Sequence, residues 1–295
     1  MEARHLKTFR VLADTLSFTK TSLILDYVQS NVTAQIQALE RELGVRLFNR
    51  LGKQVSLTDA GERLLPYANQ IVQLLDEARH AVSAHQAPQG QVRIGAPESV
   101  CSYRLPSMLQ ALRQQHPLVK PVFCPGPVSE LIQRVRRGEL DVAFILDAPV
   151  QVDDLTACVL TQEPINLICS PDHPLAQSAT LDVATLTKTP LLATETGCTY
   201  RTLFEQTVAE MGISIAETLE YRSVEAIKQC VMAGMGFAVL PHMAIRREVD
   251  QGLLVVLPWE LPPAILALQL IWRRDKWLPD AVQACIAVTK GQVWG

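Results

Sequence analysis

The chain has 295 residues, a length that allows about two domains. Its composition, 48% hydrophobic and 19% charged residues, fits globular domains with sizeable cores. The longest apolar runs, such as residues 264–271, are shorter than the ~20 residues that span a bilayer. The first residues contain no apolar signal-peptide segment. We therefore expect a cytoplasmic protein with no membrane partner.

Charge and cysteine content narrow the chemistry further. Residues 1–58 contain eight Lys and Arg against five Asp and Glu, a net charge of +3, so the rest carries −6 of the overall −3. A basic head on an acidic body makes a nucleic-acid partner compatible with an acidic chain. The seven cysteines form no CxxC pair, so the sequence predicts neither a disulfide framework nor a metal site, and no cofactor.

Apolar spacing predicts three helices at the start of the chain. A helix over 3–15 precedes a second one over 18–25, which Ser17 can cap. After a tight turn over 26–28, a third helix over 29–43 would bury Val32, Ile36, Leu39 and Leu43 and end at Gly44. Two short helices, a tight turn and a third helix are typical of a helix-turn-helix.

The third helix and the segment after it carry candidate DNA contacts. Compact polar side chains that suit base edges and phosphates lie on the exposed side of this helix. They are Gln29, Ser30, Asn31, Thr33, Gln35 and Gln37. Two extended runs over 45–50 and 54–57 predict a hairpin with Arg50 and Lys53 near its tip, where cations would meet phosphate. The alternative for the polar residues is an ordinary solvated helix face.

Four motifs resemble, in order and spacing, those of the LysR-type transcriptional regulators. They are SFT at 17–19, QSNVT at 29–33, LERELGVRLFNR at 39–50 and LTDAG at 57–61. The resemblance implies a winged helix-turn-helix over 1–58 that binds double-stranded DNA. It also implies a linker and dimerisation helix with a hinge over 59–90, and an effector-binding domain over 91–295 that is similar to periplasmic binding proteins.

The chain departs from the family pattern at three places. Thr21 and Ser22 stand where the family usually has two alanines, and Leu23 and Ile24 stand at positions that are usually polar. Val28 replaces a serine that commonly caps the recognition helix. Loss of a cap typically costs about 0.5–2 kcal/mol, which a packed three-helix unit can absorb.

A heptad pattern follows the hairpin. Apolar residues recur at steps of four and three, which is typical of a coiled-coil seam. They are Leu64, Ala68, Ile71, Leu75, Ala78 and Val82. The pattern predicts a homodimer, and the resemblance implies a homotetramer; a helix packed on its own domain is the alternative. Pro66 predicts a bend near the helix start, and Pro88 and Gly90 end the pattern.

Strands and helices alternate in the remainder, which predicts parallel α/β units. Strands over 91–96, 119–124 and 142–146 alternate with helices from about 99–102 and over 129–137. A second unit has strands over 165–169, 191–193, 218–221 and 237–240, with helices over 199–211 and 223–233. By resemblance, lobe one spans 91–161 and 267–295, and lobe two spans 162–266. The fold class is therefore α plus α/β: a winged helix-turn-helix, a long linker helix and a two-lobed α/β body.

An enzyme is disfavoured by the motifs. The sequence has no GxSxG elbow, Walker loop or Rossmann glycine fingerprint. Redox sensing is a stronger alternative, because Cys198 precedes a predicted helix, where thiol pKa values fall. No second cysteine lies in the same segment to resolve it.

The effector is expected between the lobes. Ligands of open α/β sheets bind beyond the carboxyl ends of the strands, where helix N-termini favour anions. We therefore expect a small polar, anionic metabolite, with Arg201 pairing a carboxylate. With the positions that the resemblance implies, the candidate contacts are Ser99, Cys101, Ser129, Thr196, Gly197, Cys198, Thr199 and Arg201. The alternative is that the hydroxyls cap helices and that Arg201 pairs with Glu98 or Glu205.

Overall fold

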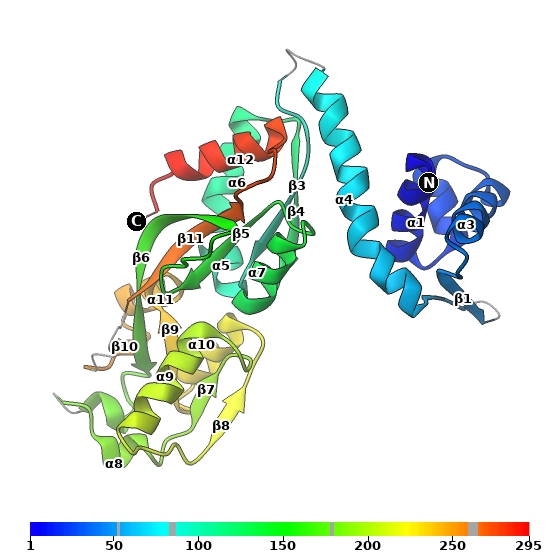
Figure 1. The fold of residues 1–295 in the computed structure, drawn as a ribbon. Helices are drawn as coiled ribbons and strands as arrows, with labels where there is room; N and C mark the ends of the chain where they lie inside the picture. The colour runs from blue at the N-terminus through cyan, green and yellow to red at the C-terminus, as the bar shows by residue number, and fades with distance from the viewer. Residues whose placement is uncertain (52–53, 83–86, 178–179, 259–264, 295) are drawn as a thin grey trace. The chain divides into compact units, whose positions relative to one another are not determined.

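The computed structural model describes residues 1–51, 54–82, 87–177, 180–258 and 265–294 (Figure 1). The chain divides into two compact units, one made mainly of residues 1–86 and the other mainly of residues 87–295. Among the described helices, none combines the length and the apolar character that a membrane span requires.

The first unit contains the three predicted helices at the predicted bounds. They are α1 (Ala3–Thr15), α2 (Phe18–Leu25) and α3 (Gln29–Leu43). Leu6, Phe9, Leu12, Ile36 and Leu39 form their shared core. Leu43 was predicted to lie on the buried face of α3 and is 38% exposed instead, because it belongs to the last turn, where the helix leaves that core.

The predicted hairpin is present as β1 (Phe48–Leu51) and β2 (Gln54–Leu57), paired antiparallel. The first strand begins at residue 48 rather than 45. The backbone N–H groups of Leu47 and Phe48 donate to Glu40 Oε1 at 2.8 and 3.3 Å, so this stretch is anchored to α3 before the strand starts. Phe48 then packs on Phe9 with ring centroids 5.4 Å apart.

Hydrogen bonds explain why the head tolerates hydroxyl residues in α2. Ser17 accepts the N–H of Lys20 at 3.3 Å, as the predicted cap. The hydroxyls of Thr15 and Thr21 lie 2.7 Å apart, and Thr21 is fully buried. Ser22 donates to the carbonyl of Thr19 at 2.9 Å. Each buried hydroxyl therefore has a partner, which removes the penalty of placing it in a core.

The long helix α4 (Asp59–Val82) is preceded by Thr58, whose hydroxyl accepts the N–H of Gly61 at 3.1 Å and donates to the carbonyl of Arg46 at 2.7 Å. Gly61 lies so close to Leu47 that a Cβ would come within 2.3 Å of the Leu47 carbonyl oxygen. Only glycine fits this contact, which joins the start of α4 to the end of the helix-turn-helix.

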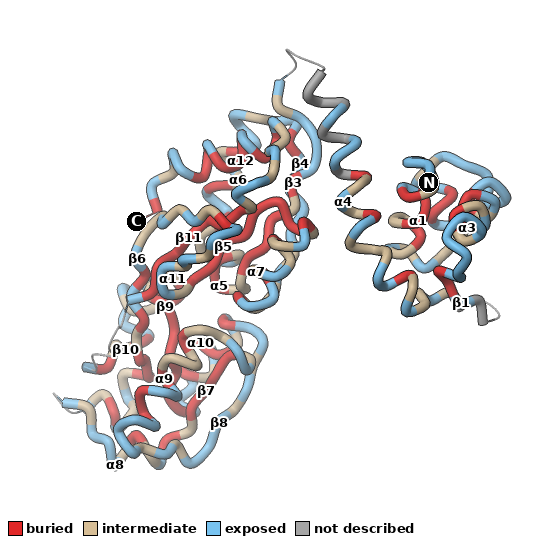
Figure 2. Tube along the Cα trace, in the orientation of Figure 1, coloured by how far each residue is buried: buried red, intermediate tan, exposed pale blue. Residues whose placement is uncertain are grey.

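The second unit is built on a sheet of nine described strands in the order β4-β3-β5-β11-β6-β9-β7-β8, with β10 (Val255–Val256) paired to β6. In the first lobe, β3 (Gly90–Ala96) lies parallel to β4 (Val119–Pro125) and β5 (Val142–Asp147), as the sequence predicted. The helices are α5 (Glu98–Tyr103), α6 (Leu105–Gln115), α7 (Val128–Arg136) and α12 (Asp280–Gly291). Figure 2 shows buried residues concentrated along the strands.

The second lobe contains β7 (Leu191–Ala193), which lies parallel to β8 (Thr218–Glu220) and β9 (Phe237–Pro241). Its helices are α8 (Val183–Leu186), α9 (Thr199–Glu210), α10 (Val224–Met232) and α11 (His242–Asp250), and η1 (Pro174–Gln177) is a short 3-10 turn.

One long strand joins the lobes. β6 (Leu155–Cys169) is one continuous strand whose first part pairs antiparallel with β11 (Ile265–Arg273) and whose second part pairs antiparallel with β9 (Figure 1). The sequence analysis predicted only residues 165–169 of β6, and neither β11, α11 nor α12. The first passage of the chain from one lobe to the other therefore lies inside a hydrogen-bonded strand.

Candidate functional site

The exposed face of α3 carries most of the predicted base-contacting residues. Gln29, Ser30, Asn31 and Gln37 are exposed, and Thr33 is half-buried with its hydroxyl donating to the carbonyl of Gln29 at 3.1 Å. A compact polar surface thus runs along one side of the helix, beginning at its N-terminus.

Gln35 does not belong to that surface, which corrects the sequence analysis. It is 8% exposed, and its Oε1 accepts the hydroxyl proton of the buried Thr8 at 2.7 Å. Its Nε2 donates to Asn31 Oδ1 at 3.0 Å. Gln35 therefore ties α3 to α1 and orients Asn31 from behind.

The two cations predicted for the wing are Arg50 and Lys53. The backbone of Arg50 lies in β1, opposite Val55 of β2. Lys53 lies outside the described residues. The antiparallel hairpin itself is the feature expected of a wing.

The predicted seam of α4 divides into two parts. Ala68 is completely buried in the core of the head, and Leu64 and Ile71 pack against that core. The first part of α4 therefore packs on its own domain, which was the alternative to the dimer seam. Ala68 has no exposed surface left for a partner helix. Leu75 is 36% exposed and Ala78 is exposed, next to Leu74 at 64%. These residues remain candidates for a partner helix; the side chain of Val82 lies outside the described residues.

In the first lobe, the turn after β3 places Ser99 and Cys101 on α5, which begins at Glu98 behind Pro97. Ser99 is 2% exposed, and Cys101 Sγ lies 3.6 Å from the carbonyl oxygen of Ala96. Burial raises the pKa of the Cys101 thiol to about 11. Ser129, on α7, is exposed. Ser99 is therefore buried and Cys101 half-buried in the helix that follows β3, whereas Ser129 is open to solvent.

In the second lobe, the turn from β7 to α9 approaches the first lobe. Gly197 has φ +90°, a left-handed conformation in which a side chain would be strained. The hydroxyl of Thr199 donates to Asp147 Oδ2, at the end of β5, over 3.4 Å. The sequence analysis named Thr199 as a candidate contact but did not name Asp147. The only sequence signal for Asp147 is its position at the carboxyl end of a buried strand.

Cys198 differs from the expectation for a reactive thiol. It is the N-cap of α9, yet burial raises its pKa, and this outweighs hydrogen bonding from Thr194 and Arg201 that acts in the opposite direction. A neutral, half-buried thiol is a poor nucleophile for peroxide. The redox alternative, which started from a lowered thiol pKa at this helix start, therefore stays an untested prediction.

Arg201 is engaged within its own lobe. Its guanidinium lies 2.7 Å from Glu205 Oε1 and 2.8 Å from Glu220 Oε2, and it also donates to the carbonyl of Thr194. Thr196, on the same turn, donates to Glu220 at 3.2 Å. This is the local pairing that the sequence analysis left open, with Glu205 as one of the predicted partners and Glu220 as an additional one.

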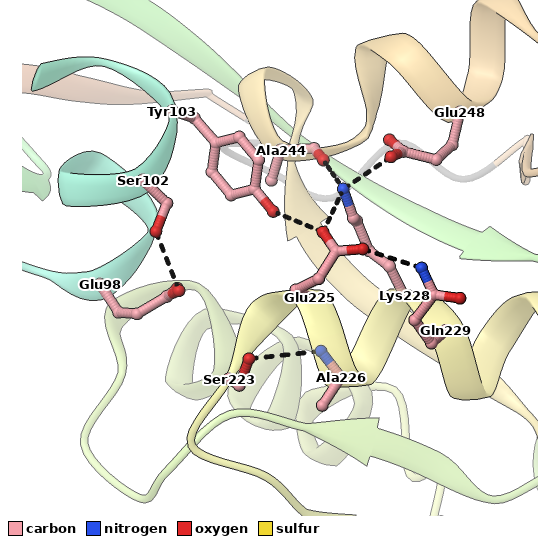
Figure 3. A network of polar contacts seen from close by, with 10 residues as sticks. All are labelled: Glu98, Ser102, Tyr103, Ser223, Glu225, Ala226, Lys228, Gln229, Ala244 and Glu248. Atoms are coloured by element: carbon pink, nitrogen blue, oxygen red, sulfur yellow. Dashed lines mark hydrogen bonds and ion pairs between the residues drawn. The ribbon is translucent and has the colours of Figure 1, made fainter. Parts of the chain in front are cut away.

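A polar network between the lobes was not predicted. Tyr103 of α5 donates to Glu225 of α10 over 3.3 Å, and the Lys228 ammonium lies 5.1 Å from the centre of the Tyr103 ring (Figure 3). Lys228 is 2% exposed and also contacts Glu225 at 3.0 Å and Glu248 of α11 at 2.8 Å.

A second interlobe contact lies beside it. Arg104 Nη2 donates to Glu163 Oε2 at 2.6 Å, and the other oxygen of Glu163 accepts the N–H of Met243 at the start of α11. Glu163 is 1% exposed. The one sequence signal for the network was the charge of Lys228 among the apolar residues Val224, Ile227 and Val231 of α10.

Carboxylates near the lobe contact hold protons more tightly than usual. Burial raises the pKa of Glu98, and the negative charges of Glu195 and Glu225 add to the rise. Burial also raises the pKa of Asp147 against hydrogen bonds from Ala148 and Thr199. Glu98 and Asp147 are therefore two acids at the lobe contact that do not share the cationic partners Lys228 and Arg104.

The head and the two-lobed body together define a class of protein: a ligand-responsive DNA-binding regulator. Residues 3–62 match the family model described as a bacterial regulatory helix-turn-helix protein of the lysR family, and residues 85–294 match the LysR substrate binding domain. The chain belongs to the LysR family of transcriptional regulators and has that family's effector-binding domain.

Similar proteins span the whole chain. An uncharacterized HTH-type transcriptional regulator of Bacillus subtilis, YwqM, is 40% identical over 98% of this chain and 99% of its own length. A full-length OxyR variant of Pseudomonas aeruginosa superposes with a TM-score of 0.79 at 24% identity, covering 100% of both chains. Full-length CbnR in complex with its target DNA superposes with a TM-score of 0.65 at 20% identity, covering 99% of both chains. The two structures share the fold of this chain.

Proposed function

We propose that the regulator binds double-stranded DNA as a homodimer or a dimer of dimers, with α3 in the major groove and the β1–β2 hairpin against phosphate. The head would span residues 1–58, the linker and dimerisation helix 59–90 and the effector-binding body 91–295. The exposed polar face of α3 carries this proposal, because its compact donors and acceptors suit base edges. We place its action in the cytoplasm and assign it no catalytic activity.

The DNA-binding proposal is tested by selecting sites from a random duplex library with the full-length protein. A partly palindromic site is expected from a symmetric dimer. Selection of no preferred sequence at any salt concentration would refute the proposal for the head.

We propose further that a small anionic metabolite controls the regulator by binding where α5, α9 and the end of β5 meet, with lobes bounded near residues 162 and 266. The observation that carries this is the contact of Thr199 with Asp147, which brings the second-lobe turn to the carboxyl end of a first-lobe strand. Ser99, Cys101 and residues 196–201 would surround the ligand, with Ser129 at its outer edge.

The guanidinium of Arg201 could bind an anionic ligand if the ligand replaced one of its present carboxylate partners, Glu205 or Glu220. Glu220 and Glu205 are each 46% exposed, and pairs with exposed acids contribute little to stability. A ligand carboxylate that replaced Glu220 could therefore gain a bidentate pair with Arg201 at small cost.

Calorimetry of the full-length protein with di- and tricarboxylates tests this model. Arg201→Ala should weaken binding at least tenfold, since a charged hydrogen bond contributes roughly 1.5–3 kcal/mol. Glu220→Gln should strengthen binding, because it removes the competing carboxylate. Ser214→Ala, at an exposed hydroxyl beyond the far end of α9, serves as the control with little effect. Unchanged affinity in a folded Arg201→Ala protein would refute the pocket.

A further inference from the structure

Val28 occupies the N-cap position of α3, the start of the proposed recognition helix. Its backbone has φ −77° and ψ 148°, and its carbonyl accepts the N–H of Asn31 at 2.9 Å. A serine, threonine, aspartate or asparagine at this position would also accept a backbone N–H with its side chain and stabilise the helix. The valine side chain makes no such bond. This helix start therefore lacks a common stabilising contact.

The valine side chain is also unusually open to solvent. It is 68% exposed, although it is branched and apolar. The exposed polar residues Gln29, Ser30 and Asn31 follow it directly on the chain. An apolar group thus borders the polar surface already assigned to DNA, and it is continuous with that surface along the backbone.

The major groove offers one apolar feature at base edges, the C5-methyl group of thymine. In helix-turn-helix proteins, the N-terminal residues of the recognition helix make the contacts to base edges. Burial of the Val28 methyl groups against a thymine methyl would remove apolar surface from water on both molecules. The same position is poorly suited to hydrogen bonding with a base, because valine has no polar atom in its side chain.

We propose that Val28 is a specificity-determining residue that packs against the methyl group of a thymine in each half-site of the operator. This inference rests on the proposed role of α3 as the recognition helix. DNA, rather than a protein, is the occupant because the valine is continuous with the polar DNA-binding face.

The test removes the methyl group from the DNA and the valine from the protein separately. A site is first selected from random duplexes with the full-length protein, and each thymine is then replaced singly by uracil, which lacks only the methyl group. Loss of one buried methyl contact corresponds to about a fourfold loss of affinity. The native protein should show this loss at one thymine per half-site, and Val28→Ser should show none there.

Val45→Ser is the matched control. Val45 is 46% exposed and follows the C-cap Gly44, so it lies at the opposite end of α3, roughly 22 Å along the helix. This variant should keep the native sensitivity to uracil. Val28→Ser should also melt at a higher temperature than the native protein, since it restores a cap; lost discrimination then cannot come from unfolding.

Each outcome separates the hypotheses. Failure to select any site would refute the proposed function of the head. Selection of a site at which uracil has no effect, or equal uracil sensitivity in Val28→Ser, would overturn the role of Val28 alone. A changed oligomeric state of Val28→Ser with unchanged base preference would assign the residue to a protein interface instead.

Discussion

Replacement of Lys228 by methionine should strongly destabilise the body. Methionine keeps most of the volume of the side chain but removes the ammonium that contacts Glu248 at 2.8 Å and the carbonyl of Ala244 at 3.0 Å. Burial alone would lower the pKa of Lys228, yet the surrounding acceptors Glu248 and Glu225 raise it to about 12. Because the pKa is raised, the stabilisation is complete at neutral pH and is lost only as pH rises towards that value.

The size of the effect follows from burial. The side chains of Lys228 and Glu248 are 3% and 13% exposed. Breaking a buried ion pair by removing one partner costs about 3–5 kcal/mol, because the other charge stays buried. Glu225 is 54% exposed and adds little. A loss of about 3 kcal/mol corresponds to a fall in melting temperature of roughly 6–12 °C for a domain of this size.

Intrinsic fluorescence is a suitable assay, since Trp272 and Trp294 are buried within the body. Lys228→Met combined with Glu248→Leu should recover most of the loss, because it removes the stranded charge. Lys188→Met, at an exposed lysine, should change the free energy of unfolding by less than about 0.5 kcal/mol. A loss below about 1 kcal/mol in the single variant, or no recovery in the double variant, would refute this reasoning.

Three further predictions concern other parts of the molecule. Asp141 is 6% exposed, and burial alone would raise the pKa of its carboxyl. Arg93 and Lys276 outweigh burial, so the pKa in the folded protein is lowered. The carboxylate therefore stabilises the folded protein above the pKa of the unfolded state, and this stabilisation is lost as the pH falls through the folded-state pKa. Asp141→Asn should therefore destabilise the protein at pH 7 and flatten its acid denaturation curve, and an unchanged curve would count against this. Leu75→Asp should shift sedimentation from dimer to monomer while the fluorescence melt of the body is retained, whereas an intact dimer would move the interface elsewhere. Gln29→Ala should change base preference, and Arg50→Ala should weaken binding to all sequences and reduce the salt slope by about 0.9, as measured by titrations at several salt concentrations; identical behaviour would contradict the division between helix and wing.

The head was predictable from sequence because its contacts are local. Helical spacing, the Ser17 cap and Gly44 fixed three helices whose bounds agree with the structure. Gln35 was misplaced because it is a polar residue that points inward, and only the partner Thr8, 27 positions away, makes that favourable. A pattern of polar and apolar residues does not contain such a pairing.

The body was less predictable because its key contacts join distant segments. Asp147 with Thr199 and Tyr103 with Glu225 are separated by 52 and 122 positions. β11 is buried on both faces, so its sequence has no alternation from which a strand could be told from a buried helix. The charge on Lys228 was visible, but its acceptors Glu248 and Ala244 lie on α11, 20 and 16 positions along the chain, and only the fold brings them to it.

The position of β11 governs the order in which the protein can be completed on the ribosome. In the sheet, β11 lies between β5 and β6, yet it is synthesised only after the whole second lobe. At the usual rate of translation, the roughly 120 residues between β5 and β11 take about 6–24 s to emerge. During that time β5 presents an unpaired edge of the kind that promotes aggregation.

The DNA-binding head, by contrast, emerges first and can fold as a unit while its control domain is still incomplete. A chain that terminates before residue 265 would carry an intact head on a first lobe with an open edge. The interleaved strand order thus ties completion of the first-lobe sheet to full-length synthesis, because any chain that ends before β11 keeps an unpaired edge on β5.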